Sequence, residues 1–194
     1  MRVNRAQAEE NRQTVINVAS RQFRAHGFDG IGLKDLMEGA GLTQGAFYKQ
    51  FSSKEDLVKH ASARALEHAT RRWLAAIGSN SGDPLGAVIA FYLSKGHREE
   101  SMDGCPIVAL GSDAARQSPE VKASFEDGIK AHLNVLQSLI YGSGAGDGKP
   151  DRKAMATLSM MVGALILSRV VNDTGLADSF LDSAAEYVRE IAAS

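Results

Sequence analysis

Amide, phenolic and cationic side chains gather in one short run of this sequence, between residues 43 and 54, and this mixture suits contact with nucleic acid. The amide of Gln44 can make two hydrogen bonds to an adenine edge in the major groove. Gly45 and Ala46 are small enough to let a helix lie deep in that groove, where the Ala46 methyl can meet a thymine methyl. Hydroxyl, phenol and ammonium groups nearby can reach phosphates or flanking bases. The predicted DNA-contacting residues are Thr43, Gln44, Gly45, Ala46, Tyr48, Lys49 and Lys54.

The surrounding residues predict the two helices that would hold this run. Four apolar residues recur at i, i+3, i+4 and i+7 and form one face of a short helix: Leu33, Leu36, Met37 and Ala40. Gly41 ends that helix, because glycine takes a positive φ without a clash. Thr43 offers a hydroxyl cap to a second helix, whose inner face carries Phe47 and Phe51. The pattern predicts a helix-turn-helix, whose second helix can enter the major groove. The alternative is a helical hairpin that only fills an all-α core.

Residues 9–59 as a whole resemble the DNA-binding domain of TetR-type transcriptional regulators. The matching stretches are VINVA at 15–19, Phe23, HGF at 26–28, GLTQGAFY at 41–48 and FSSKEDL at 51–57. The resemblance implies a DNA-binding regulator, and most simply a repressor, that binds a palindromic operator as a dimer and is released by a small effector. One departure concerns Ile31 and Gly32, where such proteins often carry hydroxyl residues. Gly32 can serve as an N-cap but brings no side chain to a phosphate.

Helical periodicity continues along the rest of the chain, and no segment shows the sustained period-two alternation of a strand. The expected fold is therefore all-α, with about nine helices. The resemblance divides them into an N-terminal three-helix DNA-binding domain, residues 1–52, and a C-terminal effector-binding and dimerisation domain, residues 53–194. Outside the helix-turn-helix over 33–51, the expected helices span about 8–25, 53–77, 84–96, 105–116, 119–140 and 151–173, with a last one after residue 178.

Capping residues predict where several of these helices begin and end. Ser53 with Asp56 resembles a capping box at the start of the fourth helix. Asp83 stands before a proline that would occupy the first helical position of the fifth helix. Gly175 is expected to end the eighth helix, and Asp178 to cap the ninth.

Charge and composition agree with a DNA-binding protein of the cytoplasm. The formal net charge is −1, but residues 1–72 hold 12 Lys+Arg against 8 Asp+Glu, whereas residues 73–194 hold 10 against 15. A basic end that faces phosphates and an acidic end kept away from them fit this asymmetry. The single cysteine excludes an internal disulfide, which fits a reducing compartment. No secretory h-region occurs, and the longest apolar run, residues 160–167, is shorter than a membrane span.

Catalytic and metal-binding chemistry is not expected. The sequence lacks the Cys/His spacing of a zinc site and the residue patterns of common enzymes, so we expect no metal, no cofactor and no enzymatic activity. The glycine-rich stretch 142–150 is not a P-loop, because Ser143 stands where a glycine is required and Pro150 where a serine or threonine is required. We expect this stretch to connect two helices.

The last two expected helices carry more apolar surface than one interior face needs, which predicts a homodimer through them. The apolar residues are Leu158, Met161, Val162, Leu165, Ile166 and Val170 in the first of the two, and Phe180, Leu181, Ala184, Tyr187, Val188 and Ile191 in the second. Gly163, Ala164 and Ser168 are small enough to allow close helix approach. TetR-type proteins typically pair these helices into a four-helix bundle. The alternative is that all of these residues belong to the core of one chain.

Methionine and aromatic side chains in the middle of the chain predict an adaptable apolar effector pocket. Apart from Arg169, the helices of this part of the chain carry few charges that could pair with a charged ligand. We therefore expect a mostly apolar or aromatic effector. The candidate lining residues are Phe91, Tyr92, His97, Met102, Cys105, Phe125, His132, Met155 and Met161.

Cys105 leaves two interpretations open. At a helix N-terminus the dipole lowers the pKa of a thiol, which would suit a repressor that senses electrophiles or oxidants. The segments 104–110 and 30–33 resemble a TetR-type branch that includes repressors of electrophile-detoxifying reductases, some of which respond through a cysteine. The second interpretation is a small buried hydrophobe. A further alternative of a different class is a helical ligand-binding module that does not bind DNA.

Overall fold

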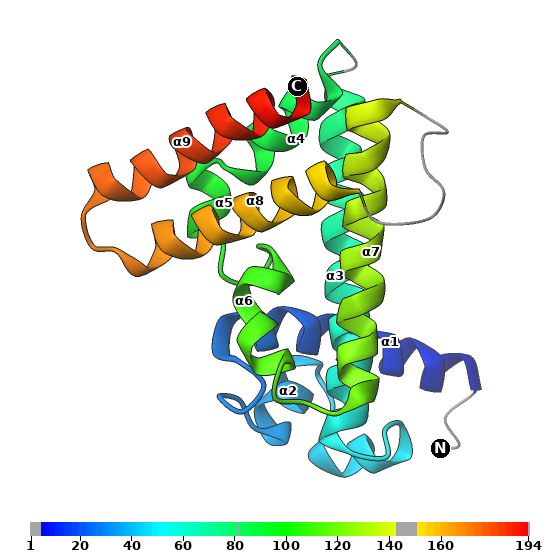
Figure 1. The fold of residues 1–194 in the computed structure, drawn as a ribbon. Coiled ribbons are helices and arrows are strands. Elements are labelled where there is room, and N and C mark those ends of the chain that lie inside the picture. Colours follow the sequence, from blue (N-terminus) through cyan, green and yellow to red (C-terminus); the bar gives the residue numbers. More distant parts are fainter. Residues whose placement is uncertain (1–4, 81, 143–150, 194) are drawn as a thin grey trace. The chain divides into compact units, whose positions relative to one another are not determined.

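The computed structural model describes residues 5–80, 82–142 and 151–193, and these ranges contain helices and no strand (Figure 1). The all-α prediction is confirmed, with nine α-helices and one 3-10 helix among the described residues. In chain order they are α1 (Arg5–His26), α2 (Leu33–Gly39), η1 (Gln44–Lys49), α3 (Lys54–Ser79), α4 (Pro84–Tyr92), α5 (Lys95–Glu99), α6 (Pro106–Ala114), α7 (Pro119–Tyr141), α8 (Arg152–Val170) and α9 (Thr174–Ala193).

The chain forms two compact units, and each is discontinuous in sequence. The first unit holds residues 1–67 and 101–126, and therefore α1, α2, η1, α6 and the first parts of α3 and α7. The second unit holds residues 68–100 and 127–194, and therefore α4, α5, α8, α9 and the remainder of α3 and α7. The functional boundary expected after residue 52 stays a prediction, because these units describe compactness and not activity.

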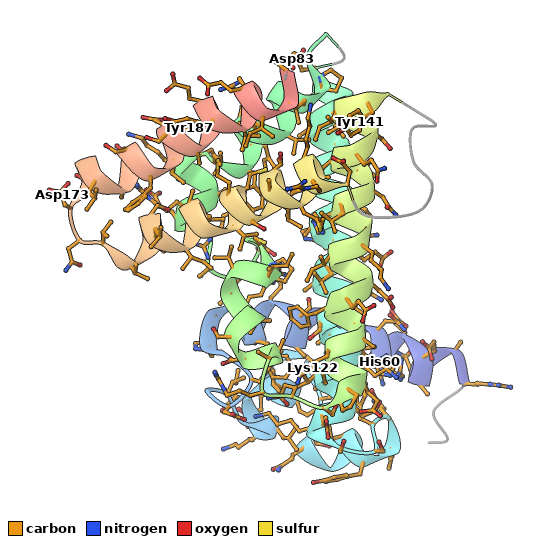
Figure 2. All side chains as sticks on the ribbon, in the orientation of Figure 1. His60, Asp83, Lys122, Tyr141, Asp173 and Tyr187 are labelled. Atoms are coloured by element: carbon orange, nitrogen blue, oxygen red, sulfur yellow. The ribbon has the colours of Figure 1, made fainter. Side chains whose placement is uncertain are left out.

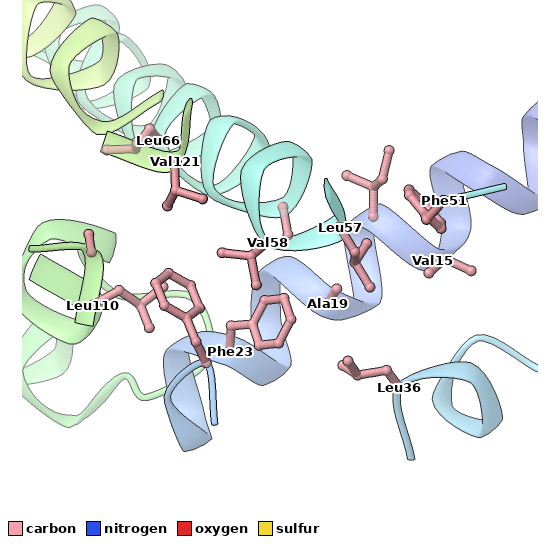
Figure 3. Close-up of a cluster of buried hydrophobic side chains, with 14 of the residues drawn as sticks. Val15, Ala19, Phe23, Leu36, Phe51, Leu57, Val58, Leu66, Leu110 and Val121 are labelled. Atoms are coloured by element: carbon pink, nitrogen blue, oxygen red, sulfur yellow. The ribbon is translucent and has the colours of Figure 1, made fainter. Parts of the chain in front are cut away.

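Aromatic rings and aliphatic side chains together form the core of the first unit (Figure 3). Phe23 and Phe28 meet edge to face with their ring centroids 5.5 Å apart, and Phe47 stacks on Phe51 at 5.4 Å. Leu36 of α2 is fully buried in the same cluster. The inner faces predicted for both helices of the helix-turn-helix are therefore the faces that the structure buries.

Residues 101–126 belong to the first unit because they bond to α1 and add to its core. The guanidinium of Arg24, whose side chain is only 2% exposed, donates to the Gly104 carbonyl at 3.0 Å. At the end of α6, the carboxylate of Asp113 accepts the main-chain amide of Phe28 at 3.2 Å. Apolar side chains of α6 and α7 join the aromatic cluster: Leu110, Ala114 and Val121. A segment distant in sequence is thus part of the unit that holds the helix-turn-helix.

In the second unit, α8 and α9 form an antiparallel hairpin (Figure 1). Small residues on both helices are buried, Ala164 and Ser168 on α8 and Ala177 and Ala184 on α9. Small side chains allow two helix axes to approach closely. Part of the surface that we expected at a dimer interface is therefore buried between these helices within one chain.

The short helix α5 is held at both ends by side chains. Ser94 caps its start, where the hydroxyl accepts the amide of His97 at 3.1 Å. Arg169 of α8 donates to the carbonyls of His97, Arg98 and Glu100 at 2.8 to 2.9 Å. Arg169, the charged residue that we expected near an effector, therefore donates hydrogen bonds to main-chain carbonyls at the end of α5.

The single helix expected over residues 84–96 is in fact two, α4 and α5. Its predicted start is confirmed, because the carboxylate of Asp83 accepts the amide of Gly86 at 2.8 Å (Figure 2 marks Asp83). The helix ends at Tyr92, however, and Ser94 adopts an extended conformation and caps a new helix. A serine can cap as well as continue a helix, so periodicity alone could not place this break.

The predicted start of α9 is wrong by five residues, because α9 begins at Thr174 and not after Asp178. Asp173, at the turn between α8 and α9 in Figure 2, accepts the main-chain amide three residues on at 2.7 Å. Gly175 therefore lies in the first turn of α9 and ends no helix. Asp178 lies inside α9, where its carboxylate bonds to Lys95 at 2.6 Å and to Arg98 at 2.8 Å. These bonds, that of Lys95 first, hold the pKa of the Asp178 carboxyl below its usual value.

By length and composition α8 could cross a membrane, with a mean hydropathy of 1.4 over an 18-residue window. The averaged window includes scattered polar residues, whereas the uninterrupted apolar run within α8, residues 160–167, is short as noted from the sequence. The core helix of a soluble protein passes the same test. α8 packs against α9, yet only 39% of its window is buried, so part of its apolar surface has no cover within the described chain.

Candidate nucleic-acid interface

The turn between α2 and η1 depends on a glycine, as predicted. Gly41 has φ +70°, where a residue with a Cβ would be strained, and its amide donates to the Glu38 carbonyl at 2.9 Å. The amide of Leu42 then donates to the Met37 carbonyl, also at 2.9 Å. The chain therefore leaves α2 sharply, and η1 begins three residues after Gly41.

η1 is a 3-10 helix and not the expected α-helix. Thr43 stands at the N-cap position, but contrary to prediction its hydroxyl makes no capping bond, and its carbonyl accepts the amide of Ala46 at 2.9 Å. The segment is six residues long and contains Gly45, and short segments of this kind often tighten to i→i+3 bonds. Side chains three residues apart are eclipsed in a 3-10 helix, so Gly45 and Tyr48 share one side.

Five of the predicted contact residues are exposed on η1 and its cap: Thr43, Gln44, Gly45, Tyr48 and Lys49. Tyr48 is 70% exposed, and its ring meets the edge of Phe47 at a centroid distance of 5.2 Å. A Cβ added to Gly45 would meet open space. Apart from the chain neighbours of Gly45 and its own helix, no atom lies within 4 Å of that position. We call these five exposed residues the open side of η1, and they present an amide, a phenol and an ammonium next to a residue without a side chain. Of the three polar side chains on η1, only Tyr48 shares the side of Gly45.

The other two predicted contact residues are not on the open side of η1. Ala46 is half-buried and packs against the core of the first unit. Lys54, the first residue of α3, is also half-buried, and its ammonium donates to the carbonyl of Ile31 at 2.8 Å.

The start of α3 is fixed by a capping arrangement close to the predicted one. The hydroxyl of Ser53 accepts the Asp56 amide at 3.1 Å, while the carboxylate of Asp56 accepts the amide and hydroxyl of Ser52 at 3.1 and 3.2 Å. Partial burial works to raise the pKa of the Asp56 carboxyl, but the bonds from Ser52 and the nearby charges of His60 and Arg12 outweigh it and lower that pKa. The carboxylate is therefore ionised and able to hold this turn at neutral pH.

Several polar contacts that position α1 were not indicated by the sequence. Arg64 of α3 donates to the side chain of Gln13 at 2.5 Å and also bonds to Asn17. The guanidinium of Arg12 lies 5.0 Å from the ring centroid of Phe51. The partners of Arg64 are 47 and 51 residues away, so no local pattern could reveal them.

In the second unit, four of the predicted effector residues belong to a chain of touching rings. Trp73, which the pocket prediction omitted, meets His132 at a centroid distance of 4.4 Å and Tyr92 at 5.6 Å. His97 meets Tyr92 at 4.8 Å and stacks on Phe91 at 5.4 Å. We call these five residues the ring chain.

Both imidazoles of the ring chain are neutral near pH 7. Nδ1 of His97 lies 2.7 Å from the Tyr92 carbonyl oxygen, and Nδ1 of His132 lies 2.8 Å from that of Gly128. Burial lowers the pKa of each imidazole, and for His97 it outweighs the opposing effects of that carbonyl and of Glu100. A neutral ring that donates through Nδ1 carries a lone pair on Nε2. The ring chain is therefore uncharged and aromatic, with two ring nitrogens of acceptor character.

The remaining predicted effector residues do not belong to the ring chain. Met102, Cys105 and Phe125 lie in the first unit. In the second unit, Met155 is exposed on α8 and Met161 is fully buried. Cys105 is the N-cap of α6, as expected, but it is only 4% exposed and its side chain makes no capping bond.

Two hollows of about 280 and 340 Å³ lie in the first unit near the start of α3. Both include Glu55 and Ser118 in mixed polar linings, and neither is lined by a predicted effector residue. Among the described residues, no group of three or more His, Cys, Asp or Glu side chains could hold a metal ion.

Two family models match the chain, one over the helix-turn-helix and one over most of the remaining helices. The family model described as bacterial regulatory proteins, tetR family, matches residues 15–61. The model described as transcriptional regulator LmrA/YxaF-like, C-terminal domain, matches residues 83–183, which is more than half of the chain.

Individual relatives agree with the family models over most of the chain. The HTH-type transcriptional regulator LmrA of Bacillus subtilis is 18% identical, covering 82% of this chain and 86% of that protein. The HTH-type transcriptional repressor NemR of Escherichia coli K12 is 21% identical, covering 99% and 98%. The crystal structure of E. coli NemR in its reduced form shares the fold, with a TM-score of 0.76 at 19% identity and coverage of 93% and 96%.

Family and relatives are regulators of transcription, which confirms that the chain is not an enzyme. The helix-turn-helix, the helical second unit and both family matches lead to the same conclusion. The chain belongs to the TetR family of helix-turn-helix, DNA-binding transcriptional regulators.

Proposed function

We propose that this regulator is a cytoplasmic repressor that binds a palindromic operator as a homodimer and is released by a small, mostly apolar effector. The observation that carries the proposal is the open side of η1, where Gln44, Tyr48 and Lys49 are exposed next to Gly45. An amide for base edges, a phenol and an ammonium for phosphates, and space for close approach together fit the major groove.

On this proposal each exposed side chain has a distinct role. Gln44 pairs with an adenine edge and contributes to the choice of sequence. Thr43, Tyr48 and Lys49 contact phosphates or flanking bases and fix the position of η1 on the duplex. One such head buries too little surface for tight specific binding, so two heads about 34–36 Å apart are needed to engage both half-sites.

The second copy of the chain is proposed to cover the free faces of α8 and α9. Large apolar side chains are exposed there: Met155, Ile166, Leu167 and Val170 on α8, and Leu176 and Tyr187 on α9. Val170 is 68% exposed and Tyr187, marked in Figure 2, is 58% exposed. Two helices with such faces can pair with the same two helices of a second copy around a two-fold axis, which gives a four-helix bundle. A second copy would also cover the apolar surface that α8 leaves open.

The small residues of α8 divide between two roles. At Gly163, no atom outside its chain neighbours and its own helix lies within 4 Å of the position of a Cβ, which leaves room for a helix of the second copy. Ala164 and Ser168, which we also expected at the interface, are buried within the chain. Only Gly163 of the three therefore supports the proposed contact between copies.

The dimer is tested by a charge on the exposed face. Val170→Glu should convert the dimer to a monomer, because a carboxylate would lose its water in an apolar interface. Leu74→Glu is a matched control, since Leu74 is 52% exposed on α3 and outside this face. Light scattering of both variants over a concentration series measures the mass in solution. A Val170→Glu protein that remains a dimer would contradict the proposed interface.

The effector is proposed to bind among residues of the ring chain. The two cations whose charges act on His97 already have partners: Arg72 bonds to both carboxylate oxygens of Glu100 at 2.6 and 2.8 Å, and Arg169 bonds to three carbonyls. An anionic effector would have to displace these bonds, whereas an uncharged aromatic compound would not. Since Cys105 is almost fully buried, thiol chemistry is not part of this proposal.

A gel-shift assay with the region upstream of the protein's own gene tests DNA binding. Gln44→Ala should weaken binding to the preferred site by about 1–3 kcal/mol and relax the choice of base at one position. Lys49→Ala should weaken binding to all duplexes and reduce the slope of log K against log[salt] by about 0.9. Lys122→Ala is the control, because Lys122 is an exposed lysine of α7 in the same unit (Figure 2). If Gln44→Ala and Lys49→Ala both bind like the wild type, η1 is not the reading element.

A further inference from the structure

One hydrogen bond joins the two ends of the helix-turn-helix. Nζ of Lys54, the first residue of α3, donates to the main-chain carbonyl of Ile31 at 2.8 Å. The two residues are 23 positions apart, and α2, the turn and η1 all lie between them. The bond therefore closes the segment that carries the open side of η1.

The start of α2 has little else from its own sequence to fix it. Gly32 is the N-cap and provides no side-chain capping bond. Its carbonyl accepts the first helical amide, that of Leu36, at 3.2 Å. The Ile31 carbonyl comes one residue earlier, outside the hydrogen-bonding pattern of α2, so its donor is either water or a group from elsewhere in the chain. The Lys54 ammonium is such a donor, and its charge strengthens the bond.

The helix dipole does not favour a cation at the position of Lys54. In the first turn of α3 a positive charge opposes the helix dipole, whereas Glu55 and Asp56 beside it suit that dipole. Lys54 is half-buried and lines a hollow that also includes the apolar Phe28 and Val58 and the acidic Asp29 and Glu55. The bond to the Ile31 carbonyl compensates for placing the ammonium there.

We propose that Lys54 is a positioning residue that sets the pose of α2 and η1 through the Ile31 carbonyl, and not a phosphate ligand. The proposal rests on the proposed function for its DNA readout. The two roles differ in salt dependence, because a phosphate ligand releases counterions and a positioning residue does not. They also differ without DNA, because only a positioning residue affects the opening of α2 in the isolated protein.

The first readout is DNA affinity as a function of salt. Binding to a random-sequence duplex of about 30 base pairs is followed by fluorescence anisotropy between about 50 and 200 mM salt for the wild type and three variants. Lys54→Met keeps the apolar stem and removes the donor, Lys54→Arg keeps a charged donor, and Lys49→Met is the matched control on η1. Lys54→Met should bind about tenfold more weakly at every salt concentration with an unchanged slope, and Lys54→Arg should recover most of the loss. Lys49→Met should lower the slope by about 0.9.

The second readout is hydrogen exchange of the protein without DNA. The amide of Leu42, which bonds to the Met37 carbonyl, should exchange about tenfold faster in Lys54→Met and at the wild-type rate in Lys49→Met. A Lys54→Met protein with unchanged exchange and a slope reduced by about 0.9 would overturn the proposal, since that is the behaviour of a phosphate ligand. If the wild type itself binds no DNA, the proposed function fails, while the exchange rates still decide the role of Lys54.

Discussion

Gly45→Ala is expected to change stability and DNA affinity in opposite directions. The new Cβ at position 45 would have no atom within 4 Å, apart from its chain neighbours and its own helix. Gly45 is also not among the described glycines with positive φ. An alanine therefore fits the backbone without strain and reduces the freedom of the unfolded chain. The free energy of unfolding should rise by about 0.4–1 kcal/mol.

The same methyl group would stand on the open side of η1, where the proposed function requires close contact with DNA. If it keeps η1 from lying at full depth, the amide of Gln44 no longer reaches its base. The affected interaction is a bidentate pair, which accounts for about 1–3 kcal/mol of discrimination. Affinity for the preferred site should therefore fall about 5- to 150-fold, although the protein itself has become more stable.

Urea denaturation measures the first effect and fluorescence anisotropy on the preferred duplex measures the second. Gly111→Ala of α6 is a matched control, because it also has open space at the Cβ position and no positive φ, and it lies in the same unit. Gly111→Ala should stabilise the protein and leave DNA binding unchanged. A Gly45→Ala protein that binds its operator as tightly as the wild type would refute the reasoning, because it would mean that no partner approaches this side of η1.

Two further substitutions test the interior of each unit. Burial lowers the pKa of His97 and His132 in the folded protein. As pH falls below about 6.5, the imidazoles of the unfolded chain are therefore protonated before those of the folded protein. The free energy of unfolding should then decrease by at most about 1.4 kcal/mol per pH unit for each imidazole. Urea melts between about pH 7.5 and 5.5 should show a smaller decrease for His132→Gln, and an equal decrease would show that this imidazole is protonated in the fold. Arg24→Met removes the donor to the buried Gly104 carbonyl and should lower the free energy of unfolding by about 1–3 kcal/mol in thermal denaturation. The exposed Arg21→Met should cost less than about 1 kcal/mol, and equal losses would contradict the role of Arg24.

The helix-turn-helix could be predicted because its determinants are local. Apolar residues at helical spacing define an inner face whether or not the rest of the chain is known, and the structure buries Leu36, Phe47 and Phe51 as that pattern requires. Gly41 could be predicted because a tight turn needs a positive φ. The exposed side of η1 follows as the complement of the inner face.

The errors arise where a residue has two local options and a distant partner decides between them. Asp173 and Asp178 both precede helical sequence and both could cap a helix. Asp178 instead pairs with Lys95 and Arg98, which are 83 and 80 residues away. The same reason applies to Lys54, whose acceptor lies 23 residues earlier. Sequence spacing predicts which residues share a helix face, but it does not reveal these partners.

The distribution of the candidate effector residues constrains how an effector could act on DNA binding. The ring chain lies in the second unit and η1 in the first, and α3 is one of the two helices with residues in both. Leu66 and Trp73 are seven residues apart on α3, which is about two turns, and each is 1% exposed. One face of α3 is therefore buried in both units. A ligand at Trp73 lowers operator affinity only if it binds better to a conformation in which this face packs differently, because equal affinity for both conformations shifts no equilibrium.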